Sequence, residues 1–458
     1  MGGLNVSLWT GTEALNAAQA ALQSASNNIA NANTAGYTRE VAQISENPQS
    51  FSGGLVTGGG VTVDGVQSVR NELLNLQIQQ QTSLKSSADA ESSSLQALQP
   101  LFSTTGEDIA STLSAFSSSL GQLSASTTNS AVQQSVLTAG QNLANSFNGT
   151  ASGLQSAQSA ADQQVTQTVA QINSLTSQIA SLNAQLTQPV VTQQNGGTIQ
   201  DQRDQLVQQL STLTSISITQ SSDGEVITTG NGTPLVMGSQ SFTLQTMIGA
   251  DGFKQVLDSN GNNITASLQG GQLGGLIQMR DQVIPGFLNS LNDLANQFAA
   301  SFNAAQAQGY DSTGTAGQPF FSILSTGSAA AGIAVALTSG SQIAASSDGS
   351  AGSNGNVTNL LAAVNGNMSS GQTPAAAYSN LIYQVGSATS NASAQSTALS
   401  DSITQLTNQQ SSVSGVNLDE ETTNLIRYQT AYEAAARVVS TIQALNNIAL
   451  YMGSPQTF

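Results

Sequence analysis

Two apolar seams with helical spacing lie at opposite ends of the chain. Near the start, apolar residues recur at alternating steps of four and three, which places them along one face of a helix. A series with nearly the same rhythm runs close to the last residue. Because each seam can cover the other, we expect the two ends to pair as a coiled-coil stalk. The first seam comprises Leu4, Leu8, Gly11, Leu15, Ala18, Leu22, Ala25, Ile29 and Ala32, and the second comprises Leu425, Tyr428, Tyr432, Ala435, Val439, Ile442, Leu445, Ala449 and Met452.

Between the two ends, apolar residues at helical spacing predict a bundle of long helices. Asn33 and Gly36 can adopt the left-handed conformation that ends helices, so the first helix is expected to stop near residues 31–36. Pro100 and Pro189 should each close a helix, and Pro285 should bend another. The expected helices cover residues 70–98, 109–123, 132–147, 165–186, 201–211, 275–307 and 375 to the end, with an interruption around 412–417.

Alternation of apolar and polar residues predicts strands in two places. Residues 37–69 are rich in turn formers and alternate from Val61 onward. In residues 216–268 the period again changes from helical to alternating, through Ile216 and Ile218 and then Phe242 and Leu244. This second region reads as a small antiparallel domain, and its turn dipeptides are Asp223-Gly224, Asn231-Gly232 and Asn260-Gly261.

These elements predict an elongated, mainly α-helical protein with a small antiparallel β domain inserted in its helical bundle. The Gly/Ser/Ala-rich segment that follows residue 308 has only weak signals, and we assign it no regular structure. The expected parts are the terminal coiled-coil helices (1–36 and 417–458), the helical bundle (37–215, 270–308 and 375–416), the β domain (216–269) and an irregular outer segment (309–374).

The charge of the chain excludes several classes of partner. The 458 residues carry a formal net charge of −17 at pH 7, and Lys85 and Lys254 are the only lysines. Nucleic acids and anionic membranes bind clustered Lys and Arg, so we predict no nucleic-acid partner. No run of residues approaches the roughly 20 consecutive apolar residues of a membrane helix, so we predict no membrane insertion. No Lys or Arg precedes the first apolar stretch, and an ordinary cleavable export signal is therefore not expected.

The chain has no Cys and no His, which excludes most catalytic and metal chemistry. Without Cys there are no disulfides, thiolate nucleophiles, iron–sulfur sites or Cys-bearing zinc sites. Without His there is no Ser-His-Asp triad and no usual neutral-pH general base. We predict no enzymatic activity, no catalytic residue, no cofactor and no metal site.

Two groups of polar residues could carry a ligand, and each has a simpler interpretation. Asp258, Asn260 and Asn262 resemble the start of a calcium loop, but Gln269 stands where such a loop places a bidentate Glu. A hairpin turn is favoured there. The run GGQLGG at 270–275 precedes a helix as a phosphate loop does, but no Lys follows it, and a strand-to-helix hinge is favoured.

Three adjacent acids near the last helix, Asp419, Glu420 and Glu421, could act as paired carboxylates in glycoside hydrolysis. Acids at the first turn of a helix also suit the positive end of its dipole, and Asn417 is placed to cap that helix. The capping interpretation is favoured.

The terminal seams remain as the candidate functional surface, against the alternative that they are simply an intramolecular core. The first seam is thinned by Gly11, Ala18, Ala25 and Ala32, so its burial offsets little of the entropy lost on ordering the ends. We hypothesise that both ends are mobile in the monomer and become ordered when neighbouring subunits pack around them.

Several stretches of the chain resemble bacterial flagellar proteins. NNIANANTAGYTR (27–39) resembles the Asn-rich signature of rod, hook and junction proteins of the flagellar axis, and SVSGVNLDEETTNLIRYQTAYEAAARVVSTIQ (412–443) resembles their closing helix. DQRDQLVQQLS (201–211), GGQLGGLIQMRD (270–281) and FNAAQAQGYD (302–311) resemble internal stretches of the flagellar hook-associated protein 1 family, which joins hook to filament. The signature residues are Asn27, Asn28, Asn31, Asn33, Gly36 and Tyr37.

The resemblance implies a secreted structural adaptor of the extracellular flagellum. It implies type III export through the flagellar channel, assembly as a ring of identical subunits at the hook tip, and an inner tube formed by the terminal helices. The implied partners are hook protein, the second hook–filament junction protein, further copies of the chain, and an export chaperone on the C-terminal helix. The implied subunit contacts are Leu4, Leu8, Leu15, Leu22, Ile29, Leu425, Tyr432, Val439 and Ile442.

Three alternatives remain open. A hook protein or flagellin would polymerise by itself into long filaments. A flagellum-borne hydrolase would use acids of the β region as its catalysts. An adhesin on a coiled-coil stalk fits less well, because such stalks usually do not bring both chain ends together.

Overall fold

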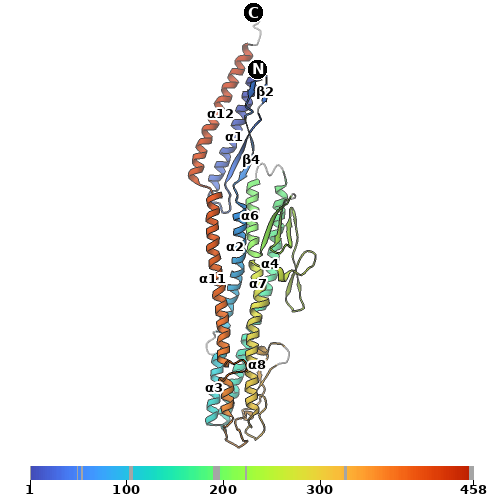
Figure 1. The fold of residues 1–458 in the computed structure, drawn as a ribbon, viewed down its shortest axis with the longest axis vertical. Helices are drawn as coiled ribbons and strands as arrows, with labels where there is room; N and C mark the ends of the chain where they lie inside the picture. The colour runs from blue at the N-terminus through green and yellow to red at the C-terminus, as the bar shows by residue number, and fades with distance from the viewer. Residues whose placement is uncertain are drawn as a thin grey trace.

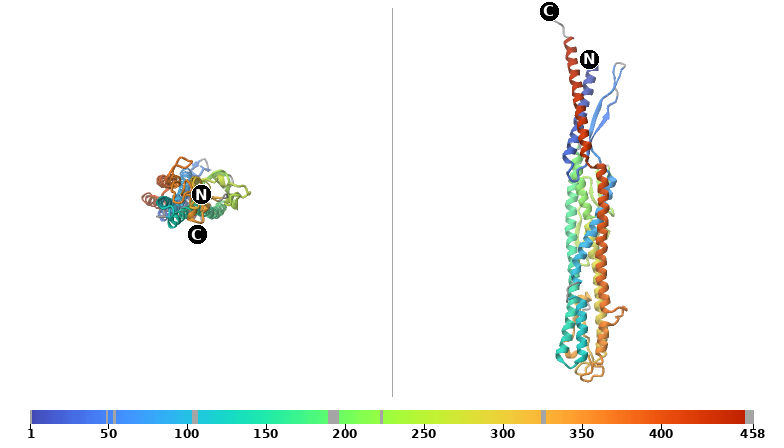
Figure 2. Two further views of the ribbon diagram at one scale, coloured as in Figure 1. Left: turned by 90° about the horizontal axis from the view of Figure 1, so that it is seen from below. Right: turned by 90° about the vertical axis from the view of Figure 1, so that its left-hand side faces the viewer.

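The protein is an elongated rod with both chain termini at one end (Figure 1). Seen end-on the rod is narrow, and its long helices run nearly parallel to its axis (Figure 2). Pro189 and Asp223, at which we expect a helix end and a turn, lie outside the described residues. The computed structural model describes residues 2–48, 50–52, 55–102, 107–188, 196–221, 224–323 and 327–452.

The two terminal helices pack side by side, which confirms the predicted pairing of the chain ends (Figure 1). They are α1 (Gly2–Asn31) and α12 (Leu418–Met452). An antiparallel ribbon packs against α1, and we call α1, α12 and this ribbon the stalk. The ribbon pairs β1 (Glu40–Glu46) with β4 (Val61–Ser68), and β2 (Ser50–Ser52) with β3 (Leu55–Thr57).

Local sequence explains where the terminal helices begin and end. α1 ends at Asn31, and Gly36 takes the left-handed conformation, with φ 77°. Asn33 does not take it, so that expectation was wrong. Asn417 caps α12 as predicted, because its Oδ1 accepts the N–H groups of Asp419 (3.0 Å) and Glu420 (3.4 Å).

Long helices run from the stalk to the far end of the rod and form the bundle (Figures 1 and 2). The two helices expected over 132–147 and 165–186 are one helix of 57 residues, because buried Ala151, Leu154 and Ala161 continue its apolar face. A π-helical segment, Met279–Val283, lies just before Pro285, at which we expect a bend. The bundle helices are α2 (Glu72–Leu98), α3 (Ile109–Ala125), α4 (Ser130–Leu186), α6 (Gly196–Leu213), α7 (Gly271–Gln278), α8 (Ile284–Ala307) and α11 (Pro374–Ser414), and a 3-10 turn, Gln99–Phe102, follows α2.

The small β domain lies on the side of α4 (Figure 1). Phe242 and Leu244, both expected in a strand, lie between two strands of the domain. The Asn173 side chain of α4 binds Leu244 there, because it donates to its C=O and accepts from its N–H, both at 2.8 Å. An antiparallel sheet has the order β5 (Ile216–Ser221), β6 (Gly224–Thr229), β7 (Pro234–Met237), β8 (Gln240–Ser241), and β9 (Gln245–Ile248) pairs with β10 (Lys254–Leu257), which is followed by a 3-10 turn, Thr265–Ser267.

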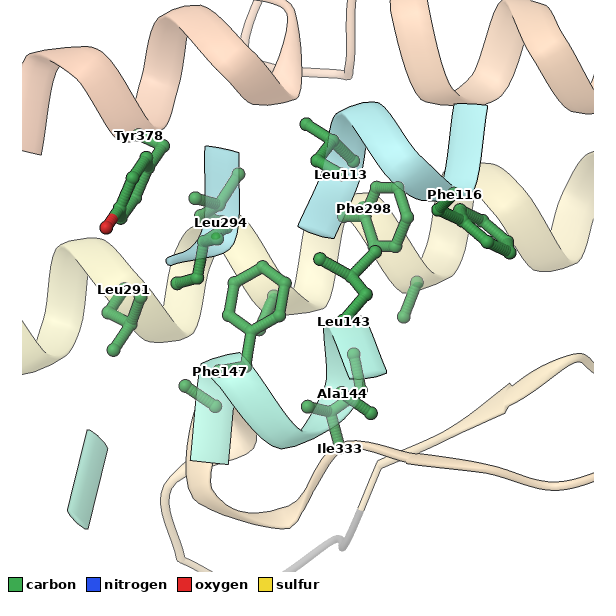
Figure 3. Close-up of a cluster of buried hydrophobic side chains, with 14 of the residues drawn as sticks. Leu113, Phe116, Leu143, Ala144, Phe147, Leu291, Leu294, Phe298, Ile333 and Tyr378 are labelled. Atoms are coloured by element: carbon green, nitrogen blue, oxygen red, sulfur yellow. The ribbon is translucent and has the colours of Figure 1, made fainter. Parts of the chain in front are cut away.

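The segment to which we assigned no regular structure folds over the far end of the bundle. Its buried Phe320, Phe321 and Ile333 belong to one apolar cluster with side chains of α3, α4 and α8. Figure 3 shows Ile333 beside Ala144 of α4. We call this apolar cluster, with Phe116 and Phe298 at its centre, the lower core. The short elements of the segment are β11 (Phe321–Ser322), α9 (Ala329–Gly332), β12 (Ala334–Val335), a 3-10 turn (Gly340–Gln342) and α10 (Val357–Asn365).

Candidate functional site

Small residues let the two stalk helices approach each other closely. Gly11 lies against α12, where a Cβ atom at this position would come within 2.9 Å of Val439 Cγ2. Ala17, Ala18, Ala21 and Ala25 of α1 are buried, as is Ala435 of α12. The Gly and Ala residues that thin the first seam therefore define the line of closest contact.

The residues predicted as subunit contacts lie on this intramolecular seam. All nine are half-buried within the single chain, so none is fully free for a second subunit. Leu445, which belongs to the same seam, is 49% exposed. The nine are Leu4, Leu8, Leu15, Leu22, Ile29, Leu425, Tyr432, Val439 and Ile442.

A second apolar face of α12 is exposed. Of its residues, only Leu445 was identified from the sequence, as part of the seam. Ile426 (63% exposed), Val438 (50%), Leu445 (49%) and Ile448 (53%) fall within an arc of about 120° at about 100° per residue. We call these four residues the outer stripe. The sequence did contain a signal for this stripe: α12 is apolar on more than one face, which is unusual for a helix with a single buried side. Trp9 of α1 is also exposed, at 48%.

The Asn-rich signature fastens the ribbon to α1. The side chain of Asn28, 1% exposed, binds the backbone of Glu40 twice: Nδ2 donates to its C=O and Oδ1 accepts its N–H, both at 2.8 Å. Tyr37 Oη donates to the same Oδ1 at 2.9 Å, and Ser24 Oγ donates to the Glu40 carbonyl at 2.7 Å. Asn28 therefore replaces a neighbouring strand and fixes where β1 begins.

The other signature residues shape the turn between α1 and β1. Asn31 Nδ2 donates to the Asn27 carbonyl at 3.0 Å, and Asn31 Oδ1 accepts from Thr34 Oγ1 at 3.2 Å. Asn33 is exposed, and Gly36 provides the left-handed backbone of the turn. The structure thus brings Asn27, Asn28, Asn31, Gly36 and Tyr37 together in one turn.

Acidic groups are concentrated beside this turn. Burial raises the pKa of Tyr37, and the charges of Glu40, Asp201 and Glu421 raise it further. Burial also raises the pKa of Glu40, with a further increase from Asp201 that Arg70 opposes. Nearby charges come from the stalk and from α6, so the turn lies where the stalk meets the bundle.

The other candidate sites have the structural roles that were favoured. Asp258 Oδ1 accepts the N–H groups of Asn260 (2.9 Å) and Asn262 (2.8 Å), so its oxygens close a turn. Hydrogen bonds from Asn262 are the main reason that the pKa of Asp258 is lowered. Gly270 and Gly271 both have positive φ and lie between the 3-10 turn Thr265–Ser267 and α7, where a strand-to-helix hinge was favoured.

Within the described ranges, no three carboxylates or other ligating side chains gather as a metal site would require. The helices of those same ranges also include none that is both long and apolar enough to cross a bilayer.

Three family models match different parts of the chain. Residues 95–321 match the flagellar hook-associated protein FlgK helical domain. Residues 8–38 match the flagella basal body rod protein, and residues 408–450 match the flagellar basal body rod FlgEFG protein C-terminal. The two rod-protein matches therefore fall on the stalk, and the third falls on the bundle and β domain.

Relatives named flagellar hook-associated protein 1 match nearly the whole chain. The protein from Bacillus subtilis (strain 168) is 30% identical over 490 residues, which cover 94% of this chain and 95% of that protein. The one from Salmonella typhimurium is 29% identical over 534 residues, with coverage of 94% and 97%. The solved flagellar hook junction protein FlgK from Burkholderia pseudomallei shares the fold, with a TM-score of 0.66 and 18% identity over 74% of this chain and 100% of that one.

Proposed function

Because the chain belongs to the flagellar hook-associated protein 1 family, we propose that it is exported through the flagellar channel and assembles as a ring of identical subunits at the hook tip. It is a structural protein of the hook–filament junction and a component of the flagellum. Its role is mechanical, and we propose that it catalyses no reaction and acts outside the cell.

The outer stripe of α12 is the observation that supports assembly. Ile426, Val438, Leu445 and Ile448 leave about half or more of their large apolar side chains exposed. Val438 also borders α1, because its Cγ1 would lie 3.8 Å from a Cβ atom at Gly11. Apolar surface of this kind is stabilised by burial in a protein–protein contact. Both chain ends supply this stalk, so one subunit presents a two-helix unit to its neighbours.

The nine seam residues predicted as subunit contacts would add to the contact that the outer stripe makes with a neighbouring subunit. Leu8, Leu15 and Val439 are half-buried by the partner helix, and a neighbouring stalk would cover the remainder. As a junction protein the chain contacts other axial components of the flagellum. We propose that these are hook protein, the second junction protein and identical subunits, and that an export chaperone covers α12 before secretion.

Two changes to the stalk, a truncation and a double substitution, distinguish this function from its alternatives. Removal of residues 417–458 should abolish filaments and release flagellin to the medium, because the ring would lose half of each stalk. A sharper variant combines Val438→Asp with Leu445→Asp, which places two charges on the outer stripe. Gln443→Asp is the matched control, because Gln443 is exposed on the same helix but lies off the stripe.

The expected result is that the stripe variant is secreted in normal amount but cells carry no filaments, whereas the control cells swim. Filament-bearing cells from the deletion strain would overturn the proposal. Purified wild-type chain that polymerised alone into long filaments would favour a hook protein or flagellin.

A further inference from the structure

The chain passes between stalk and bundle only twice in the part that the structure describes. Residues 69–71 connect β4 to α2, and residues 415–417 connect α11 to α12. Short peptide connections such as these do not by themselves fix an angle between two helical units. The orientation of the stalk must therefore depend on contacts where the two parts meet. One is a backbone bond, in which the N–H of Arg39 donates to the Ser414 carbonyl at the end of α11 at 3.0 Å, and the others come from side chains.

We infer that Asp201 and Gln205 of α6 form a latch that fixes the orientation of the stalk on the bundle. Asp201 Oδ2 accepts the N–H of Thr38 at 3.1 Å. One turn further along α6, Gln205 Nε2 donates to the carbonyl of Ala35 at 2.8 Å. Both bonds reach backbone atoms of the signature turn, so α6 holds the stalk itself and not a mobile side chain.

Arg70 connects the same latch to the start of α2. Its guanidinium donates to Asp201 Oδ1 at 2.6 Å, to the Gly197 carbonyl at 3.2 Å, and to Asp204. The side chains of Arg70 and Asp201 are 15% and 9% exposed, so this ion pair is shielded from solvent. Asp201 is therefore bonded both to Arg70, in the connection formed by residues 69–71, and to Thr38 in the signature turn.

The turn is shaped to receive the latch. Gly36 has φ 77°, a conformation that side chains rarely adopt, and the Gln205 side chain occupies the space into which a Cβ atom at residue 36 would point. Glycine is therefore required at this position for two reasons. The signature around Gly36 and the internal DQRDQ stretch meet here, although they are far apart in the sequence.

A second ion pair at the joint is a weaker link. Arg39 Nη1 lies 3.2 Å from Glu420 Oε1, but the side chain of Glu420 is 55% exposed. Solvent-exposed pairs of this kind contribute little. Glu420 therefore offers a matched control within the same joint.

The absence of Cys allows the orientation to be measured directly. Spin labels on Gln178→Cys of α4 and Gln443→Cys of α12, both exposed, report the distance between bundle and stalk in the full chain. In the Asp201→Ala, Gln205→Ala variant the distance distribution should broaden about twofold, because the hinge is released. The amide of Thr38 should also exchange at least about tenfold faster.

Glu420→Gln should leave both readouts unchanged. Should the double variant lose helical content, Gln205→Ala alone keeps the test valid, because Gln205 lies at the surface. If the Asp201→Ala, Gln205→Ala variant and the Gln205→Ala variant both gave a spin-label distance distribution as narrow as that of the parent, the latch would be overturned.

The consequence for assembly rests on the proposed function, because a ring requires every stalk to have the same angle. The latch and the proposed function can be disproved by different experiments. The spin-label measurement uses the isolated protein and does not depend on any flagellum, whereas failure of the proposed function would appear only in the filament assays.

Discussion

The lower core and the interface between α2 and α11 hold the same bundle together by different means. In the lower core, six Phe rings form pairs with centroids 4.7–6.5 Å apart, and Phe116, Phe298, Phe302 and Phe320 are fully buried. Phe116, Phe147 and Phe298 of this group are labelled in Figure 3. Along α2, the buried side chains include Gln79, Thr82, Ser83 and Ser92. On α11, no side chain from 393 to 413 is buried.

Hydrogen bonds between short polar side chains connect α2 and α11. Gln410 donates to Asn75, and Ser396 donates to Asp89. Gln79 Oε1 and Ser83 Oγ are buried without a partner. A hydrogen bond contributes about 0.5–1.5 kcal/mol net, whereas a buried aromatic side chain contributes more through area alone. Apolar burial therefore holds the far end of the rod more firmly than polar contacts hold α2 to α11, and a second apolar cluster joins α4, α6 and α7 to the β domain.

The lower core should be the most sensitive part to truncation. Phe116 contacts the rings of Phe298, Phe302, Phe320 and Phe321, so Phe116→Ala leaves a cavity that the neighbours cannot fill. We expect a loss of about 3–5 kcal/mol in the free energy of unfolding, measured by chemical denaturation.

Tyr383→Ala on α11, where the side chain is 73% exposed, is the control and should change stability by less than about 0.5 kcal/mol. Similar losses for the two variants would mean that the lower core is not the main source of cohesion.

Hydrogen exchange should divide α11 into two parts. Amides of residues 393–413 should exchange about 10–100 times faster than those of residues 378–392, which corresponds to about 1.4–2.7 kcal/mol less opening free energy. The reason is that Tyr378, Leu381 and Val385 anchor only the first part in apolar surroundings. Mass spectrometry of peptides from the intact protein provides the measurement.

Uniform protection along α11 would contradict this division. The same data test the hypothesis that both chain ends gain full order only in the polymer. Strong protection of residues 4–31 and 418–450 in the isolated protein would reject that hypothesis.

Replacing a polar side chain at the α2–α11 interface should be harmless. Gln79 is 9% exposed and lines a groove of about 280 Å³ together with Ile403 and Thr407 of α11. Because its Oε1 has no partner, Gln79→Leu removes a desolvated group, and we expect unfolding to become up to about 1 kcal/mol more costly. A loss of stability beyond about 1 kcal/mol would show that Gln79 makes an essential hydrogen bond.

The smallest expected effect is a response to pH near the stalk. Burial raises the pKa values of Glu40, Asp201 and Glu225, against the opposing effect of nearby Arg side chains. A carboxyl with a raised pKa in the folded state stabilises below its ordinary pKa, and this contribution is lost as pH rises through the raised value. Denaturation should therefore require more free energy at about pH 5 than at about pH 7.5.

Glu40→Gln removes one of these groups and should reduce the difference between the two pH values. A decrease in stability over the same range would indicate that ion pairs outweigh burial at the joint.

Periodicity was enough to predict the helices, because a helix with one buried face shows its spacing in the sequence. The stalk pairing and the cap at Asn417 followed from local rules. The outer stripe could not be predicted in the same way. Val438 and Val439 are equally apolar, and only the packing of the two helices decides that Val439 lies closer to Gly11 while Val438 stays 50% exposed. The apolar residues of 309–374 were likewise visible, but their place in the lower core was not.

The sequence by itself determined the elongated helical fold, the pairing of the ends, and the absence of Cys and His chemistry. Only the tertiary structure decided which Asn side chains act as clamps. Asn28 binds the backbone of Glu40, Asn173 that of Leu244, and Asn303 that of Phe321, each through one N–H and one C=O. Asn28 stands in the Asn-rich signature, but no local pattern shows which backbone groups these Asn side chains bind, because those groups are 12, 71 and 18 residues away and approach only when the chain folds.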